Sequence, residues 1–277
     1  MQEIPLNVMI DIEFLSKVYF WFDLPVPYNL GDNKEILIYP INIKDSELFL
    51  SSIDIISVDK NSSSNPNHIS MSYLDFLVSV FIFSDDSKVS EFSKIKLAFL
   101  LSTCLKWTEQ KEIQIVVDDK KRSKIIYKDY EIQSKQFEDI RRIILYQNLI
   151  DFDDSYINPD VKEAINELEK MKSKNIEVPN MERKMAIITA HTGISKQSQM
   201  EMTYRSHTAL FKEVYGEVDY CTVRTAALIG NMFSKKKNEI EDWIYKKKQD
   251  KYSKYFTSQE KYSESMGGNV SIRPEPL

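Results

Sequence analysis

The spacing of apolar and polar residues near the start of the chain predicts a helix followed by a β-hairpin. Residues 10–22 are densely apolar and lead to Pro25 and Pro27, which stop a helix and favour an extended segment. A Gly-Asp-Asn turn at 31–33 then precedes a short β-branched run at 35–39. We therefore expect a small antiparallel element here.

Further along, the apolar positions predict buried helices. Asp45 is placed to cap a helix that carries Leu48, Phe49, Ile53 and Ile56. Two strongly apolar runs follow at 71–83 and 90–107, separated by a polar break. Neither run reaches the roughly 20 apolar residues that a membrane-spanning helix needs, so we interpret both as core helices.

A second β element is predicted at 112–132. Two β-branched segments, 112–117 and 124–132, flank the charged loop DDKKRS at 118–123, which is typical of a hairpin. The basic loop is interpreted as a solvated turn, with a specific binding role left open.

From residue 136 onward the pattern is helical. The segment 136–149 predicts one helix, and 157–175 predicts a second, with Asn158 as cap, Pro159 in the first turn and an apolar stripe over Val161, Ala164, Ile165, Leu168 and Met171. The two helices are expected to belong to a helical region that is separate from the N-terminal β elements.

The stretch AIITAHTGISKQSQMEMTY, residues 186–204, predicts two helices around a short polar turn. Gly193 is expected to end the first helix, and Ser198 with Glu201 forms a capping-box pattern for the second. The second helix would carry one face of Met200, Tyr204, His207, Phe211 and Val214. Gly216 is expected to end it, with a further helix after that.

These elements predict a mainly α-helical α+β fold with an N-terminal β-hairpin, a second hairpin and a C-terminal helical bundle. The expected domains are a mixed unit at 1–134, a helical domain at 135–232 and a Lys/aromatic helix with a flexible tail at 233–277. With 42% apolar and 29% charged residues, the composition is that of a folded globular protein.

The charge and cysteine content narrow the function classes. A net charge of -5 argues against a surface that is basic all over, although a local basic patch stays possible. Cys104 and Cys221 lie in apolar helical stretches, so both are interpreted as buried structural thiols in a reducing compartment. The acidic start of the sequence lacks the basic region of an export signal, so we expect a cytoplasmic protein.

No pattern with catalytic chemistry stands out. The sequence contains no H-E-x-x-H, C-x-x-C, G-x-x-x-x-G-K-[ST], G-x-G-x-x-G or G-x-S-x-G motif. The histidines are His68, His191 and His207, and their spacing suits no metal site; His207 is interpreted as a core or interface histidine. We therefore predict no catalytic residue, no cofactor and no metal, that is, not an enzyme.

Two segments could bind nucleic acid. The 186–204 stretch has the layout of a helix-turn-helix in which Gln199 could contact a base edge, but Glu201 is an acid where phosphates would approach. The segment 233–256 alternates lysines with aromatics, diluted by four acidic residues. For both, helical packing is the competing interpretation.

For 233–256 the packing interpretation predicts a partner-docking or intramolecular amphipathic helix. The candidate partner-binding residues are Ile240, Trp243, Ile244, Tyr252, Tyr255 and Phe256.

Two stretches resemble a known family. The segment LPVPYNLGDNKEILIYPINIKDSELFL at 24–50 and the block RKMAIITAHTGISKQSQMEMTYRSHTALFKEVYGEVDY at 183–220 are similar to the tail assembly chaperones of tailed phages of Gram-positive hosts. In the second block the resemblance rests on Thr192-Gly193, Met202-Thr203 and Leu210-Phe211.

The resemblance implies a protein without catalysis. It would bind the tape-measure protein and tail-tube subunits in the host cytoplasm during assembly, without a membrane, and could form a homo-oligomer. A structural tail or baseplate protein that stays in the virion is the first alternative. A nucleic-acid-binding regulator that uses 186–204 is the second.

Overall fold

The computed structural model describes residues 11–63, 65–119, 122–150, 152, 161, 164–165, 167–168 and 179–233. Contacts divide the chain into two units, 1–163 with 175–215 and 164–174 with 216–277. Each unit is described by itself. The predicted fold class is confirmed, because the described chain is mainly helical with two small antiparallel sheets.

The first unit begins with a short helix and the predicted N-terminal hairpin. Helix α1 (Ile12–Val18) runs into the 3-10 helix η1 (Phe20–Phe22), and strands β1 (Val26–Gly31) and β2 (Lys34–Ile38) pair antiparallel. Asp32 and Asn33 connect the strands with φ of 51° and 58°. Two left-handed residues give a turn whose twist matches that of the strands, and Asp and Asn tolerate this conformation well.

The central part of the unit is helical, as predicted from the apolar runs. Its elements are η2 (Ile43–Asp45), α2 (Ser46–Ser52), α3 (Asp54–Ser57), η3 (Lys60–Ser62), α4 (Pro66–Ser70), α5 (Tyr73–Leu77), the wider turn η4 (Val78–Ile82), α6 (Ser87–Leu105) and η5 (Gln110–Glu112). Asp45 stands at the N-cap position of α2, but its side chain makes no capping hydrogen bond.

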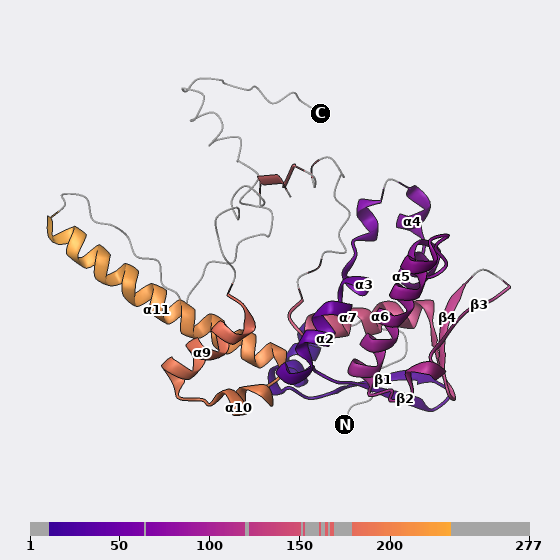
Figure 1. Ribbon diagram of the computed structural model, residues 1–277, viewed down its shortest axis with the longest axis horizontal. Helices are drawn as coiled ribbons and strands as arrows, with labels where there is room; N and C mark the ends of the chain where they lie inside the picture. The colour runs from indigo at the N-terminus through magenta and orange to yellow at the C-terminus, as the bar shows by residue number, and fades with distance from the viewer. Residues whose placement is uncertain are drawn as a thin grey trace, which may run out of the picture. The chain divides into compact units, whose positions relative to one another are not determined.

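The second predicted hairpin is a three-stranded sheet in the order β3–β4–β5, so this prediction was wrong in strand number. The strands are β3 (Gln114–Val117), β4 (Ser123–Tyr127) and β5 (Tyr130–Gln133), all antiparallel. Lys128, with a φ of 51°, and Asp129 turn the chain inside the run that the sequence presented as one strand. The β3–β4 hairpin projects beyond the helices of this unit (Figure 1).

Helix α7 (Ser134–Gln147) follows β5 directly and lies against α5, β5 and the N-terminal hairpin. Its apolar side chains belong to the same buried cluster as those of α5 and α6; its members include Leu74, Leu77, Leu97, Leu101, Ile125, Phe137, Ile140 and Ile144. Helix α7 therefore shares one core with the helices before residue 134. The predicted domain boundaries at 134 and 232 stay a prediction.

The described range 179–233 contains α9 (Met181–Thr192), α10 (Lys196–Met200) and α11 (Tyr204–Phe233). Gly193 ends α9 with a φ of 75°, which confirms the predicted stop. The expected helix end at Gly216 was wrong, because α11 continues through this glycine. A glycine inside a helix costs only about 1 kcal/mol, so this residue alone does not end the 30-residue helix α11.

The capping prediction at Ser198 was also wrong. The hydroxyl of Ser195 accepts the backbone N–H of Ser198 at 3.1 Å and caps α10. The helix that carries His207 begins later, where the Thr203 hydroxyl accepts the N–H of Ser206 at 3.1 Å. Ser198 was a plausible cap by residue type, but a second Ser and a Thr nearby provide the caps used.

Some predictions lie outside the described residues, among them Asn158, Pro159 and Met171 in the 157–175 helix. In the described ranges, helices are too short or too polar to cross a lipid bilayer.

Candidate functional site: an exposed apolar surface beside the α11 N-terminus

The predicted partner-binding residues Ile240, Trp243, Ile244, Tyr252, Tyr255 and Phe256 all lie outside the described part of the chain. They stay a prediction. Among the described residues, the clearest candidate surface is on α1 and η1, which sequence analysis treated only as a dense apolar run.

This α1–η1 surface is formed by five exposed large side chains, Phe14, Val18, Trp21, Phe22 and Leu24. Phe14 and Val18 are four residues apart and share one face of α1, while Leu15 is buried on the inner face. Helix α1 is thus apolar on both sides. A short surface helix normally turns polar residues outward, so an apolar outer face indicates a surface that binds something.

The most exposed members are aromatic. Trp21 is 62% exposed and Phe22 is 66% exposed, whereas Phe20, directly before them in the sequence, is only 1% exposed. The polar residues Glu13 and Lys17 of α1 flank Phe14 and Val18 in the sequence and form an ion pair at 2.7 Å. An apolar aromatic centre with a polar rim is the composition of a protein-binding site.

The carboxylate of Asp23 holds the chain next to these aromatics against the start of α11. Asp23 adopts a φ of 56° and its two oxygens accept hydrogen bonds from the hydroxyls of Thr203 and Ser206, both at 2.6 Å. Thr203 caps α11 and Ser206 lies in its first turn, so Asp23 places a negative charge at the positive end of the helix dipole. The α1–η1 surface is therefore held in position by α11.

Arg205 of α11 also contacts the α1–η1 region. Its guanidinium lies 5.5 Å from the centre of the Phe20 ring and donates to the Tyr146 carbonyl at 2.9 Å. Burial lowers the pKa of Arg205, and Asp23 opposes that shift. Arginine keeps its charge under such a shift, so this contact persists across ordinary pH.

The backbone joins the same two regions of the chain. Asn42 and Thr203 form an antiparallel bridge, with the Ile43 N–H donating to the Met202 carbonyl at 2.9 Å. The Tyr204 N–H donates to the Ile41 carbonyl. Segments 24–50 and 183–220 thus meet at this junction.

Behind the junction lies a buried polar network. The Gln199 amide donates to the Met185 carbonyl, the Thr189 hydroxyl and the Ile194 carbonyl, at 2.9–3.1 Å. Its oxygen lies 3.1 Å from Nε2 of His207. Gln199 and His207 are fully buried. Gln199 was the predicted base-contacting donor, and its burial leaves it unable to reach a base edge.

His207 is a core residue, as the sequence indicated, but only one of its ring nitrogens is bonded. Nδ1 has no hydrogen-bond partner among the residues that the structure describes. Burial lowers the pKa of His207, and the nearby Lys184 ammonium lowers it further. The imidazole is therefore held neutral inside the helical packing.

A second apolar surface lies on α6 and the turn before it, formed by Phe83, Val89, Phe92 and Ile95. It differs in having cations over its rings. The Lys96 ammonium lies 4.7 Å from the Phe92 ring centre, and Lys94 lies 5.4 Å from that of Phe83. In the part of the chain that the structure describes, no lysine or arginine lies over Trp21 or Phe22 in this way.

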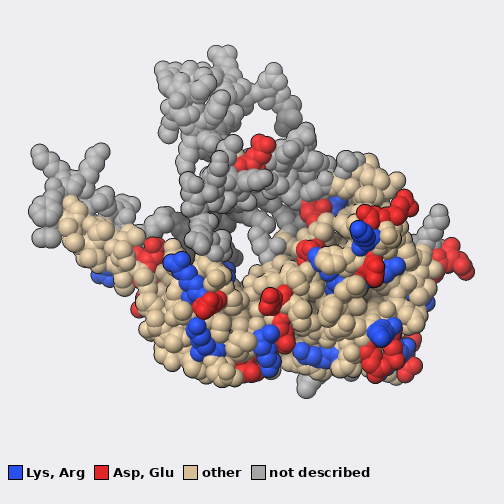
Figure 2. Space-filling view, in the orientation of Figure 1, with Lys and Arg blue, Asp and Glu red and all other residues tan. Residues whose placement is uncertain are grey.

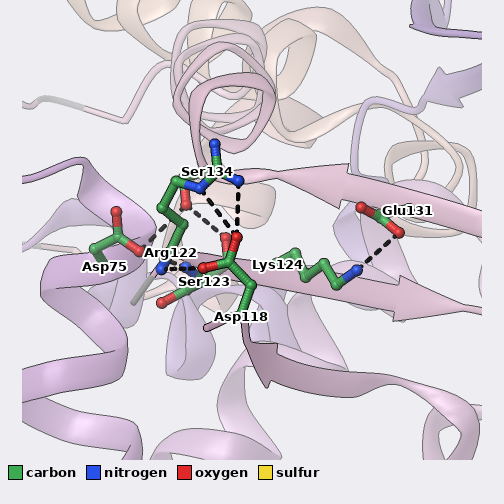
Figure 3. A network of polar contacts seen from close by, with 7 residues as sticks. All are labelled: Asp75, Asp118, Arg122, Ser123, Lys124, Glu131 and Ser134. Carbon is green, nitrogen blue, oxygen red and sulfur yellow. Dashed lines mark hydrogen bonds and ion pairs between the residues drawn. The ribbon is translucent and has the colours of Figure 1, made fainter. Parts of the chain in front are cut away.

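The predicted charged loop at 118–123 is held by its own ion pairs. Arg122 donates through Nε and Nη2 to one carboxylate oxygen of Asp118, at 3.0 and 2.8 Å, and Lys124 pairs with Glu131 at 3.1 Å (Figure 3). Asp75 joins α5 to this region, because its carboxylate accepts from the Ser123 N–H and the Ser134 hydroxyl. These pairs fix the hairpin and neutralise two of its cations.

Blue and red side chains are interspersed on the face drawn in Figure 2, and no continuous basic field forms there. Nucleic-acid binding relies on lysines and arginines that neutralise phosphates. This face gives such binding little support.

The two cysteines that the sequence predicted to be buried, Cys104 and Cys221, differ in exposure. Burial raises the pKa of the Cys104 thiol to about 12, which confirms a buried structural residue. Cys221 is exposed, so that prediction was wrong. It lies on the distal half of α11, where apolar side chains are also exposed. Within the described ranges, no group of three or more His, Cys, Asp or Glu side chains could hold a metal ion.

Comparisons of the chain with protein-family models, with curated proteins and with solved structures find no match.

Proposed function

We propose that this protein is a non-enzymatic binding protein that holds apolar segments of other proteins, and that it serves as a tail assembly factor of a tailed phage. The observation that carries the binding role is the α1–η1 surface, where Phe14, Val18, Trp21, Phe22 and Leu24 are exposed within eleven residues of chain.

The size and chemistry of these side chains favour a protein partner. Tryptophan and other aromatics dominate the energetics of interfaces because each buries a large area with few rotatable bonds. Covering such a patch removes apolar area from water at about 25 cal/mol per Å². A helix of the partner that docks on this surface would present apolar residues every three or four positions.

The rigid support of this surface agrees with the proposal. Asp23, between Phe22 and Leu24, is bonded to Thr203 and Ser206 of α11. A preorganised site loses less conformational entropy on binding than a mobile one. The aromatics next to Asp23 are therefore presented on a fixed backbone.

The phage assignment rests on the resemblance and on one structural observation that supports it. The two stretches that resemble tail assembly chaperones are separated by more than 130 residues in sequence, and they are joined through the Asn42–Thr203 bridge. The proposed clients are accordingly the tape-measure protein and tail-tube subunits, and the proposed location is the host cytoplasm.

The experiment is a pull-down of a tagged full-length chain from phage-infected cells, washed with nuclease and with high salt, followed by mass spectrometry. Docking of apolar surfaces tolerates salt, whereas phosphate contacts weaken steeply as salt rises. Recovery of a long helical tail protein and tube subunits under both washes is the expected result.

Two other outcomes would contradict the proposed function. Loss of all partners after nuclease, with DNA or RNA abundant before it, would favour the nucleic-acid alternative. Presence of the chain in purified virions at fixed stoichiometry would favour the structural tail protein.

A further inference from the structure

Strand β3 forms one edge of the three-stranded sheet, whose order is β3–β4–β5. Within the described ranges, β3 pairs with β4 and with no other strand. The hairpin of these two strands projects beyond the helices of its unit (Figure 1). The outer side of β3 is therefore an edge to which a further strand can add.

The register of the hairpin shows which backbone groups of β3 face outward. The Asp118 N–H donates to the Arg122 carbonyl at 3.0 Å, and this pair continues the β3–β4 register. Hydrogen-bonded and non-hydrogen-bonded pairs alternate along an antiparallel ladder. Val116 therefore bonds inward to β4, whereas the N–H and C=O groups of Ile115 and Val117 point away from the sheet. In the described part of the chain, no backbone group outside the sheet bonds to them.

Two opposite charges lie symmetrically about Ile115. Lys111, in η5, is four residues before it, and Asp119, in the turn after β3, is four residues after it. Both side chains are exposed. Among the described residues, the ion pairs around this sheet involve neither of them. The strand thus has a free cation near one end and a free anion near the other, as far as the structure describes it.

This symmetry makes the edge complementary to itself. When two β3 strands run antiparallel with Ile115 opposite Ile115, position 111 of each copy comes beside position 119 of the other. Opposite charges then meet at both ends, and such cross-strand pairs stabilise a sheet. A shift of the register by two residues keeps the outward backbone groups in contact but separates Lys111 from Asp119. Charge therefore selects the pairing centred on Ile115.

The backbone and the apolar side chains fit the same register. The two Ile115 residues exchange hydrogen bonds across the two-fold axis. The Val117 N–H of each copy reaches the Ile113 carbonyl of the other. Val117 is 40% exposed and Ile113 is partly buried, so their side chains also cover each other.

This register brings one pair of like charges together, because Glu112 comes opposite Asp118. Each of these carboxylates has a cation of its own. Arg122 pairs with Asp118 at 2.8 Å, and the Lys128 ammonium lies 3.9 Å from a Glu112 oxygen. Their mutual repulsion is therefore weakened within each copy.

We propose that the outer edge of β3 is a self-association site, where β3 of a second copy pairs antiparallel about Ile115 and Lys111 of each copy meets Asp119 of the other. A contact of this length is at the small end of protein interfaces, so the dimer forms only at high protein concentration. The proposal is independent of the tail-assembly role, which uses the α1–η1 surface.

The test is sedimentation velocity of the full-length chain and of two single variants, Lys111→Glu and Asp119→Lys. The wild type should pass from monomer towards dimer as its concentration rises from about 5 to 500 µM. Each variant alone sets like charges together at both ends of the pair, so its dissociation constant should rise at least about fivefold. Both side chains are exposed, and circular dichroism checks that the fold is kept.

An equimolar mixture of the two variants is the matched control. In a mixed pair, the native Lys111 of one chain faces the native Asp119 of the other, and the two introduced charges face each other. Dimerisation should therefore return to the wild-type level. A wild type that stays monomeric, or variants that dimerise as the wild type does, would overturn the proposal. Weakened variants whose mixture stays weak would overturn the antiparallel pairing.

Discussion

Two exposed apolar surfaces of the first unit differ in what lies over their rings. Phe92 on α6 is 60% exposed, about as much as Trp21 on η1. Lysine ammonium groups lie over the rings of Phe83 and Phe92, and Lys96 also pairs with Asp54. Such lysines cover apolar area while keeping their charge in water. Among the residues that the structure describes, no lysine or arginine covers Trp21 or Phe22 in this way, which is why we assign the binding site to them.

The difference shows that exposure alone does not identify a binding surface. An aromatic ring beneath a lysine already has part of its area shielded, and a partner would have to displace or desolvate the cation. An uncovered ring on a fixed backbone has no such barrier. The comparison therefore predicts that mutations on the two surfaces have very different consequences.

The largest expected effect comes from removing the uncovered aromatics. The double variant Trp21→Ser with Phe22→Ser should weaken client binding by about 100-fold, since two hot-spot aromatics typically contribute several kcal/mol together. Both side chains are exposed, so the fold should be retained. Affinity for the recovered client is measured by titration calorimetry, with circular dichroism as a check on folding. Unchanged affinity in a folded variant would show that the client does not bind the α1–η1 surface.

The next effect tests the support behind that surface. Asp23→Asn keeps a residue that tolerates positive φ but removes the charge at the start of α11, and should lower the free energy of unfolding by about 1–2 kcal/mol. Asp45→Asn is the control, because the Asp45 carboxylate makes no capping bond to α2. Its expected effect is below about 0.5 kcal/mol. Urea unfolding distinguishes them, and equal losses would contradict the role of Asp23.

The buried histidine gives a pH dependence of moderate size. The pKa of His207 is lowered in the folded protein from its ordinary 6.5, so below pH 6.5 the unfolded chain binds a proton that the folded chain resists. Stability should be full above pH 6.5 and fall as the pH drops below it, by less than about 1.4 kcal/mol per pH unit.

The measurement for His207 is the urea midpoint at pH 7.5 and 5.0 in the wild type and in His207→Gln. The substitution should reduce the difference between the two pH values. A wild-type slope that persists in full in the variant would assign the effect to other groups.

The smallest effect is expected on the covered surface. Phe92→Ser with Ile95→Ser removes as many large exposed side chains as the α1–η1 double variant, yet should change client affinity by less than about threefold, as a near-neutral contact would. The same titration measures both. A loss comparable with that of Trp21→Ser and Phe22→Ser would erase the distinction between the two surfaces.

Much of the fold could be predicted from local pattern. The N-terminal hairpin, the core helices and the end of α9 at Gly193 all have strong short-range signals in turn residues and apolar spacing. The extra turn at Lys128 could not be found in this way, because lysine rarely adopts a positive φ and gives no turn signal. Gly216 gave a misleading signal, because glycine more often marks a helix end.

The candidate site was less accessible to sequence reasoning. Apolar periodicity indicates which residues are suited to burial but not which are left uncovered, and Phe20, Trp21 and Phe22 look alike in sequence while only the first is buried. The hydrogen bonds from Thr203 and Ser206 to Asp23 join residues 180 and 183 positions apart in sequence, so no local sequence pattern indicates them. Trp21 and Phe22 could have been suspected from two large aromatics placed directly before a turn.

Hydrogen exchange of the client complex recovered by the pull-down tests the central assignment most directly. Amide protection on binding is compared between peptides covering residues 12–24 and peptides covering α6, residues 87–105. The account predicts added protection at 12–24 and none at 87–105. Added protection at 87–105 without any at 12–24 would contradict it.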